Sequence, residues 1–139
     1  MAKRLFVNLP IKEVNRTRNF FESLGFEFNP MFSDDKALCL VLGENFFAML
    51  LEEPYFQTFI TKPISNAKET TEVLLSLQLD TKEDVHRMVD KAIELGAREY
   101  NPPTDNGFMF QRVFEDLDGH QWEIAWMDET YNFDDLKNA

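Results

Sequence analysis

The feature that most constrains how this chain can fold is an internal duplication of one pattern. Helical periodicity begins at Glu13-Val14 and stops at Leu24-Gly25, and the same pattern begins at Asp84-Val85 and stops at Leu95-Gly96. The two helical stretches have the same length from their first to their last residue. Each follows one segment with the pattern of a β-strand and precedes three further segments of that kind. Self-similarity of this kind identifies a repeated supersecondary unit before any single motif is considered. The sequence therefore predicts two βαβββ halves.

The repeat divides the chain into four segments. Module one covers residues 3–52, a linker covers 53–69, module two covers 70–127, and a C-terminal tail covers 128–139. Thr81 is a suitable N-cap for the second helix, and the linker contains one expected helical turn around residues 55–60. The expected strands are residues 3–11, 26–32, 36–42, 45–51, 72–79, 97–101, 107–115 and 120–127. A chain of 139 residues with 44% hydrophobic content is long enough to fold as one domain with its own core.

The expected fold class is α+β, with one helix for every four strands. A single helix covers only one face of its sheet, so the other face of each module is expected to form a concave cleft. Alternation along residues 120–127 places Trp122 on the helix side and Glu123 in the cleft. The same reasoning applied to the first strand of each module completes the cleft, although it is weaker for residues 3–11, where both faces contain apolar residues. The residues assigned to the cleft are Phe6, Asn8, Ser76, Gln78 and Glu123.

Composition excludes several classes of function. A net charge of −11 argues against binding to a phosphate backbone, which needs clustered Lys and Arg, so no nucleic-acid partner is expected. No segment approaches the ~18 apolar residues of a membrane helix, and the N-terminus lacks the apolar stretch of a signal peptide. The single cysteine, Cys39, lies in an apolar run and is expected to be a small buried hydrophobe, which fits a reducing cytoplasm.

The stretch FEDLDGHQWEI, residues 114–124, has two interpretations. Asp, Glu and His side chains bind divalent cations, so its composition permits a metal site. Asp118-Gly119 between two strand patterns also predicts a tight β-hairpin turn, which explains these two residues but not Glu123. His120 is expected to stabilise the turn or lie at the surface, and His86 is expected to be solvated beside the second helix. Neither histidine therefore forms a His-Glu pair in the cleft.

The paired modules, a helix ending in Leu-Gly-Phe, and the sequence DLDGHQWEIAWMD resemble the vicinal oxygen chelate superfamily. This superfamily includes glyoxalase I, bleomycin-resistance proteins and extradiol dioxygenases, and the resemblance spans nearly the whole chain. Its C-terminal signature is Asp-Pro-Asp-Gly followed shortly by Glu, and here Asp116-Leu117-Asp118-Gly119 leads to Glu123. In metal-dependent members that glutamate is a metal ligand, together with side chains from the first strand of each half and the fourth strand of the first half.

The resemblance implies a ligand set that this chain has mostly lost. The first-strand positions fall on Phe6 and Leu74, and the fourth-strand position falls on Phe47, Ala48 or Met49. None of these side chains is a hard oxygen or imidazole ligand, so Glu123 is the only retained position. A divalent cation held by one carboxylate would stay mostly hydrated, because Zn needs three or four protein ligands and Mg or Ca needs several oxygens. No bound metal is therefore expected.

Two functions are consistent with this pattern. The first is a small-molecule binding or sequestering protein similar to the bleomycin-resistance branch, without a metal, whose acidic balance favours cationic ligands. The alternative is a metal-dependent glyoxalase-like lyase or isomerase using Ni, Zn, Fe or Mn. Glu123 is a candidate general base in either case, and whether any reaction is catalysed stays open. Arg112, the only basic residue in strand 107–115, is a further cleft candidate that could neutralise Glu123 or Glu115 or meet an anionic ligand, although the sequence does not assign its face.

A homodimer is expected, because members of the superfamily commonly pair their modules within or between chains. The tail YNFDDLKNA, residues 131–139, has two aromatic residues that could cover a partner or an edge strand. The alternative for the last five residues is a frayed acidic tail.

Overall fold

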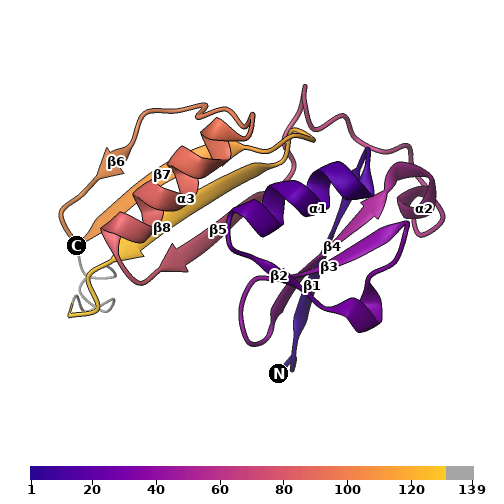
Figure 1. Ribbon diagram of the computed structural model, residues 1–139, viewed down its shortest axis with the longest axis horizontal. Helices are drawn as coiled ribbons and strands as arrows, with labels where there is room; N and C mark the ends of the chain where they lie inside the picture. Colours follow the sequence, from indigo (N-terminus) through magenta and orange to yellow (C-terminus); the bar gives the residue numbers. More distant parts are fainter. Residues whose placement is uncertain (131–139) are drawn as a thin grey trace. The chain divides into compact units, whose positions relative to one another are not determined.

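The computed structural model describes residues 1–130 and divides the chain into two compact units. The first unit contains residues 1–72 together with the short segment 117–119, and the second contains residues 73–116 and continues from residue 120. Each unit holds one four-stranded sheet and one long helix (Figure 1). The two βαβββ modules expected from the repeat are therefore confirmed. The tail aromatics of residues 131–139 lie outside the described residues.

The first unit has the strand order β1-β4-β3-β2, in which β1 pairs with β4 in parallel and the other neighbours are antiparallel. Its elements are β1 (Leu5–Ile11), α1 (Val14–Ser23), β2 (Glu27–Phe28), the 3₁₀ turn η1 (Pro30–Phe32), β3 (Ala37–Val41), β4 (Phe46–Glu52) and α2 (Glu53–Gln57). The expected strand 26–32 is thus only two residues long, because Pro30 starts the 3₁₀ turn and Asn29 caps it by accepting a hydrogen bond from the Met31 N–H.

The core of the first unit lies between α1 and one face of this sheet (Figure 1). Leu9 and Ile11 of β1 are 4% and 2% exposed, so odd positions of this strand face the core while Phe6 and Asn8 are exposed. Cys39 is fully buried and burial raises the pKa of its thiol, which agrees with its expected role as a small hydrophobe. Burial of each large aliphatic or aromatic side chain stabilises the unit by about 1.5–3 kcal/mol. The helix contributes Val14, Thr17, Phe20 and Phe21.

The second unit repeats the arrangement with the strand order β5-β8-β7-β6. Its elements are β5 (Leu74–Leu79), α3 (Lys82–Glu94), β6 (Thr104–Asp105), β7 (Met109–Glu115) and β8 (Gln121–Met127). Thr81 caps α3 as expected, because its hydroxyl accepts a hydrogen bond from the Asp84 N–H at 3.0 Å. The expected strand 97–101 is absent from the second unit's sheet: Arg98 forms only an isolated bridge to Glu115, and the short strand lies later, at residues 104–105.

The face assignments in the second unit are confirmed. Trp122 and Ile124 are fully buried beneath α3, which contributes Val85, Val89 and Ala92 to the same core. Leu75 is 9% exposed, whereas its neighbours Leu74, Ser76 and Gln78 are exposed on the other face. No helix among residues 1–130 is long and apolar enough to span a bilayer.

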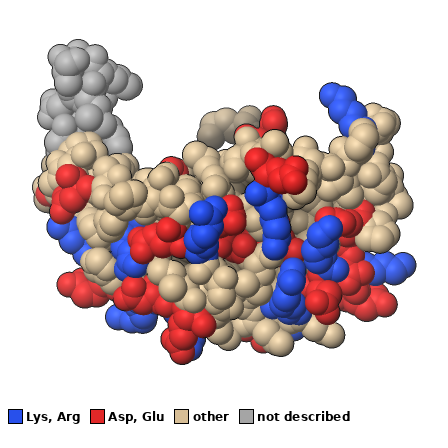
Figure 2. Space-filling model, turned by 90° about the horizontal axis from the view of Figure 1, so that it is seen from above, with Lys and Arg blue, Asp and Glu red and all other residues tan. Residues whose placement is uncertain are grey.

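Charged side chains of both signs are mixed on the face drawn in Figure 2. Exposed ion pairs of the described chain include Lys12–Glu53 at 2.8 Å and Arg87–Asp84 at 2.7 Å. Such pairs contribute little to stability, about 0–1 kcal/mol each. Their consequence is electrostatic: a phosphate backbone approaching this face would meet acidic groups beside the basic ones.

Candidate functional site

Glu123 occupies the open face of the second sheet, the face turned away from α3. Its carboxylate accepts a hydrogen bond from the Ser76 hydroxyl, and Ser76 is its register partner on β5. The other carboxylate oxygen accepts a hydrogen bond from Gln111 Nε2 of β7 at 3.4 Å. Two strands flanking β8 thus hold a half-buried carboxylate in a fixed position. The alternation that placed Ser76 and Glu123 on one face is confirmed, whereas Gln111 was missed although it shares that face.

Tyr100 adds a phenol to the surroundings of Glu123. Its pKa is raised, first by burial and then by the negative charges of Glu123 and Glu115. The phenol therefore stays protonated across the physiological range and is available as a hydrogen-bond donor. The expected strand 97–101 includes Tyr100, but the residue lies in the loop after α3, so the sequence did not place it beside Glu123.

Gln78 lies on the same open face but does not bond to Glu123. Its side-chain amide donates to Glu129 Oε1 at 3.0 Å. Gln78 therefore shares the face of Glu123 without contacting its carboxylate, and Ser76 and Gln111 supply the hydrogen bonds to Glu123.

Arg112 faces α3 rather than the open face. It pairs with Ile124 across β7 and β8, and Ile124 is fully buried under the helix. Its guanidinium donates two bonds to Glu99, both 2.9 Å, and one to Asp90 at 2.9 Å. These hydrogen bonds, that to Glu99 first, raise the pKa of Arg112. The expectation that Arg112 lies beside Glu123 is corrected, because strand alternation puts residues 112 and 123 on opposite faces once the hairpin register is known.

The two histidines also lie away from the open faces. His86 is exposed, and its Nδ1 is 3.0 Å from Arg112 Nη1, so it belongs to the cluster on the helix side. Of the two alternatives expected for His120, the turn-stabilising one is confirmed, and with 8% exposure the residue is not at the surface. It closes the turn after β7: its N–H donates to Asp116 Oδ1 at 3.0 Å, and Asp116 Oδ2 accepts from Trp122 Nε1 at 2.9 Å. The expected hairpin is confirmed, but its connection spans residues 116–120 rather than two residues.

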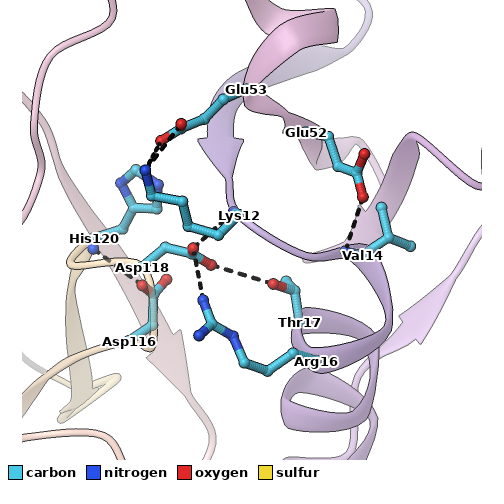
Figure 3. Close-up of polar contacts among 9 residues, drawn as sticks. All are labelled: Lys12, Val14, Arg16, Thr17, Glu52, Glu53, Asp116, Asp118 and His120. Carbon is cyan, nitrogen blue, oxygen red and sulfur yellow. Dashed lines mark hydrogen bonds and ion pairs between the residues drawn. The ribbon is translucent and has the colours of Figure 1, made fainter.

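Asp118 and Gly119 belong to the first unit. Asp118 accepts hydrogen bonds from the Lys12 N–H at 2.9 Å, Arg16 Nη2 at 3.1 Å and the Thr17 hydroxyl at 3.2 Å (Figure 3). Its side chain is 5% exposed, and it satisfies a backbone N–H just before α1, where Glu13 provides no side-chain cap. The acidic residues of the motif are therefore explained by structure, with Glu123 as the exception.

The open face of the first sheet carries apolar and aromatic side chains, whereas the open face of the second sheet carries Glu123. Phe6 stacks on Phe47 with ring centroids 5.0 Å apart. A pocket of about 390 Å³ lies farther along the same face and includes Asn8 and Met49, which are register partners. Its remaining lining comes from η1, α2, the neighbouring loops and one residue each of β3 and β4. These residues are Met31, Phe32, Ser33, Asp34, Ala37, Leu51, Tyr55 and Phe59.

The strand registers identify which residue of β4 corresponds to Glu123. Asn8 and Ser76 each lie three residues before the end of the first strand of their module. Asn8 pairs with Met49, and Ser76 pairs with Glu123, so Met49 is the counterpart of Glu123. Ala48, the third possibility from the sequence, is fully buried beneath α1. The position implied for a fourth-strand metal ligand is therefore a thioether.

The donor groups do not fit the divalent metal site of metal-dependent relatives. Phe6 and Leu74, the implied first-strand positions, lie exposed on the open faces of their sheets and have no donor atom. Among residues 1–130, no three His, Cys, Asp or Glu side chains are arranged to hold a metal ion. A thioether is a poor ligand for hard divalent ions, so Met49 does not replace a carboxylate.

Comparison with known proteins identifies clear relatives. The family model of the Glyoxalase/Bleomycin resistance protein/Dioxygenase superfamily matches residues 4–124. A hypothetical protein from S. aureus is 28% identical with a TM-score of 0.76, over 91% of this chain and 95% of that one. A glyoxalase/bleomycin resistance protein/dioxygenase family enzyme from Burkholderia phytofirmans PsJN is 19% identical with a TM-score of 0.74, over 91% and 99%. The fosfomycin resistance protein FosX from Listeria monocytogenes is 15% identical with a TM-score of 0.65, over 91% and 93%. No curated protein matches the chain.

Proposed function

Because this chain belongs to the Glyoxalase/Bleomycin resistance protein/Dioxygenase superfamily, we propose that it binds or sequesters a small molecule without a bound metal. One observation carries this proposal: three of the four positions that supply metal ligands in metal-dependent relatives are the apolar side chains Phe6, Met49 and Leu74. The fourth, Glu123, accepts hydrogen bonds from Ser76 and Gln111, which is the environment of a polar anchor.

The open face of each sheet is by itself a candidate surface for binding. Large apolar surface there, with a few oriented polar groups, is the usual composition of a small-molecule site. Phe6 and Phe47 offer a stacked aromatic surface in the first unit. Glu123 and Tyr100 offer an acceptor and a donor in the second. The first unit thus offers an apolar surface to a ligand, and the second offers hydrogen-bonding groups.

The alternative is the metal-dependent lyase or isomerase, with Glu123 as a metal ligand or general base. In proton-abstracting relatives the metal stabilises the negative charge that develops on the substrate oxygen. Glu123 alone provides a base but no such electrophile, so this alternative depends on ligands that the registers do not supply.

Metal analysis separates the two functions. The protein is purified from cells supplied with Ni, Zn, Fe or Mn, and the metal content per chain is measured for the wild type and for Glu123→Gln. Glu83→Gln, on the exposed side of α3, makes the same chemical change and serves as the control. We expect a metal content near zero in all three proteins. Ligand binding is measured by thermal shift with a small-molecule library, and it should change only in Glu123→Gln. Stoichiometric metal that is lost in Glu123→Gln alone would restore the lyase.

The same proposal includes a cytoplasmic homodimer. Leu5 and Phe46, register partners at the start of β1 and β4 in the first unit, are 55% and 57% exposed, an apolar surface that a second copy of the chain would cover. The buried thiol of Cys39 is compatible with a reducing compartment. Sedimentation at micromolar concentration tests the assembly, and a mass equal to one chain would contradict it.

A further inference from the structure

The pocket of the first unit has a lining that selects for one chemical class of ligand. It holds three aromatic rings and two thioethers, from Phe32, Tyr55, Phe59, Met31 and Met49. Its volume of about 390 Å³ lies within the range of small-molecule sites, roughly 300–1,000 Å³. Phe32 and Phe59 are 57% and 64% exposed, so these rings present their surface to an incoming molecule rather than to the core.

The charged group of this pocket is the carboxylate of Asp34, and its neutral polar side chains are Asn8, Ser33 and Tyr55. Asp34 uses Oδ1 to accept the N–H groups of Lys36 and Ala37, at 2.8 and 3.0 Å, which fixes the carboxylate at the rim. Asn8 donates only a long 3.5 Å bond to the Phe6 carbonyl oxygen, and its amide oxygen has no partner among residues 1–130. No Lys or Arg of the described chain lines the pocket. The lining therefore opposes anions.

Aromatic faces attract cations because the ring quadrupole is negative above and below the plane. Tyr55 and Phe59 meet edge to face, with ring centroids 5.0 Å apart and planes at 77°, so two ring surfaces are presented at a large angle to each other. A carboxylate beside such rings adds a direct charge interaction, and the thioether side chains adapt to the apolar part of a ligand.

We propose that this pocket binds organic cations, molecules in which an ammonium group is attached to an apolar or aromatic body. The cation lies between the aromatic rings and Asp34, and a donor of the ligand reaches the Asn8 amide oxygen. The inference rests on the proposed small-molecule binding function and names its ligand class. Other occupants, a neutral aromatic molecule or a second copy of the chain, give different results in the experiment below.

The test uses methionine methyl groups as reporters. The full chain is labelled with ¹³C-methyl methionine, and Met31 and Met49 report on the pocket. Met88, on α3 of the second unit, is the internal control. Benzyltrimethylammonium, benzyl alcohol and benzoate are titrated separately at low salt. We expect ring-current shifts at Met31 and Met49 but not at Met88, and binding of the cation about tenfold tighter than that of benzoate, a ratio typical of one charge interaction.

Two variants isolate the charge. Asp34→Asn keeps the Oδ1 acceptor for the backbone N–H groups and removes the negative charge. The affinity for the cation relative to benzoate should therefore fall to the value that the aromatic rings alone provide. Asp35→Asn makes the same change at the next residue, which is exposed and does not line this pocket, and should leave the preference unchanged. Added salt should reduce the preference in the wild type more than in Asp34→Asn.

The outcomes distinguish the ligand class from the proposed function. Equal binding of the three molecules, or tighter binding of benzoate, would overturn the organic-cation inference and leave metal-free binding intact. Shifts of Met31 and Met49 on dilution without any ligand would mean that a second copy covers the pocket, which also overturns the inference. Stoichiometric metal in the purified protein would contradict the proposed function whatever the three molecules do.

Discussion

Gly119→Ala should destabilise the protein strongly, although it adds only one methyl group, because Gly119 is buried in its turn. Gly119 has φ = +93°, where a residue with a Cβ costs roughly 1–2 kcal/mol. A Cβ there would also lie 2.8 Å from the carbonyl carbon of Ala67 and 2.8 Å from the backbone nitrogen of Lys68. Backbone cannot rotate away as a side chain can, so the turn or residues 67–68 must move, at a further cost of about 1–3 kcal/mol.

The two contributions sum to about 2–5 kcal/mol, a large part of the 5–15 kcal/mol that stabilises a typical domain. The assay is urea denaturation at fixed protein concentration, followed by the fluorescence of the buried Trp122. Gly107→Ala is the matched control, because Gly107 has φ = +82° but no atom within 4 Å of the added Cβ, so it reports the conformational cost alone. Equal losses in the two variants would refute the close-approach argument.

Three further predictions concern buried or half-buried polar groups. Asp118→Ala removes the acceptor of three hydrogen bonds at the start of α1 and should lower the free energy of unfolding by about 2–4 kcal/mol, with Asp118→Asn losing less; urea denaturation measures both. Arg112→Met leaves Glu99 and Asp90 without their cation and should cost about 1–3 kcal/mol, yet it should not alter ligand binding at the Glu123 face; a loss of binding would contradict its placement on the helix side. Glu123→Gln should lower the raised pKa of Tyr100 toward its usual value near 10, observed by ultraviolet titration of the phenol. Because the folded-state pKa of Tyr100 is above the unfolded value, its contribution to stability is complete below about pH 10 and is lost as pH rises further.

Local pattern was sufficient for the architecture of this protein. The helix ends at Gly25 and Gly96 were predictable because each glycine takes a positive φ that other residues avoid, and Thr81 was predictable as a cap for the same local reason. Strand alternation placed Ser76, Gln78 and Glu123 on one face because successive side chains of a strand point to opposite sides. These features depend on interactions within a few residues, which the sequence displays directly.

Pairing across strands was decided only by the tertiary structure. The face of Arg112 depended on the length of the turn after β7, which is set by hydrogen bonds of Asp116 to His120 and Trp122 rather than by a dipeptide rule. The register of β4 against β1 is likewise a contact between distant segments, and it identified Met49 as the counterpart of Glu123.

Part of the surroundings of the candidate sites came from a loop and a turn where the sequence had predicted strands 97–101 and 26–32. Tyr100 lies in a loop, and Met31 and Phe59 reach their pocket from a 3₁₀ turn and the segment after α2. Loop side chains follow the path of the chain over the folded core, and no repeating pattern records that path in the sequence. The sequence by itself therefore determined the two modules, their helix ends and the cleft faces of their strands. The hydrogen-bond partners of Glu123 and the lining of the aromatic pocket required the folded chain, because they join residues whose proximity depends on long-range packing.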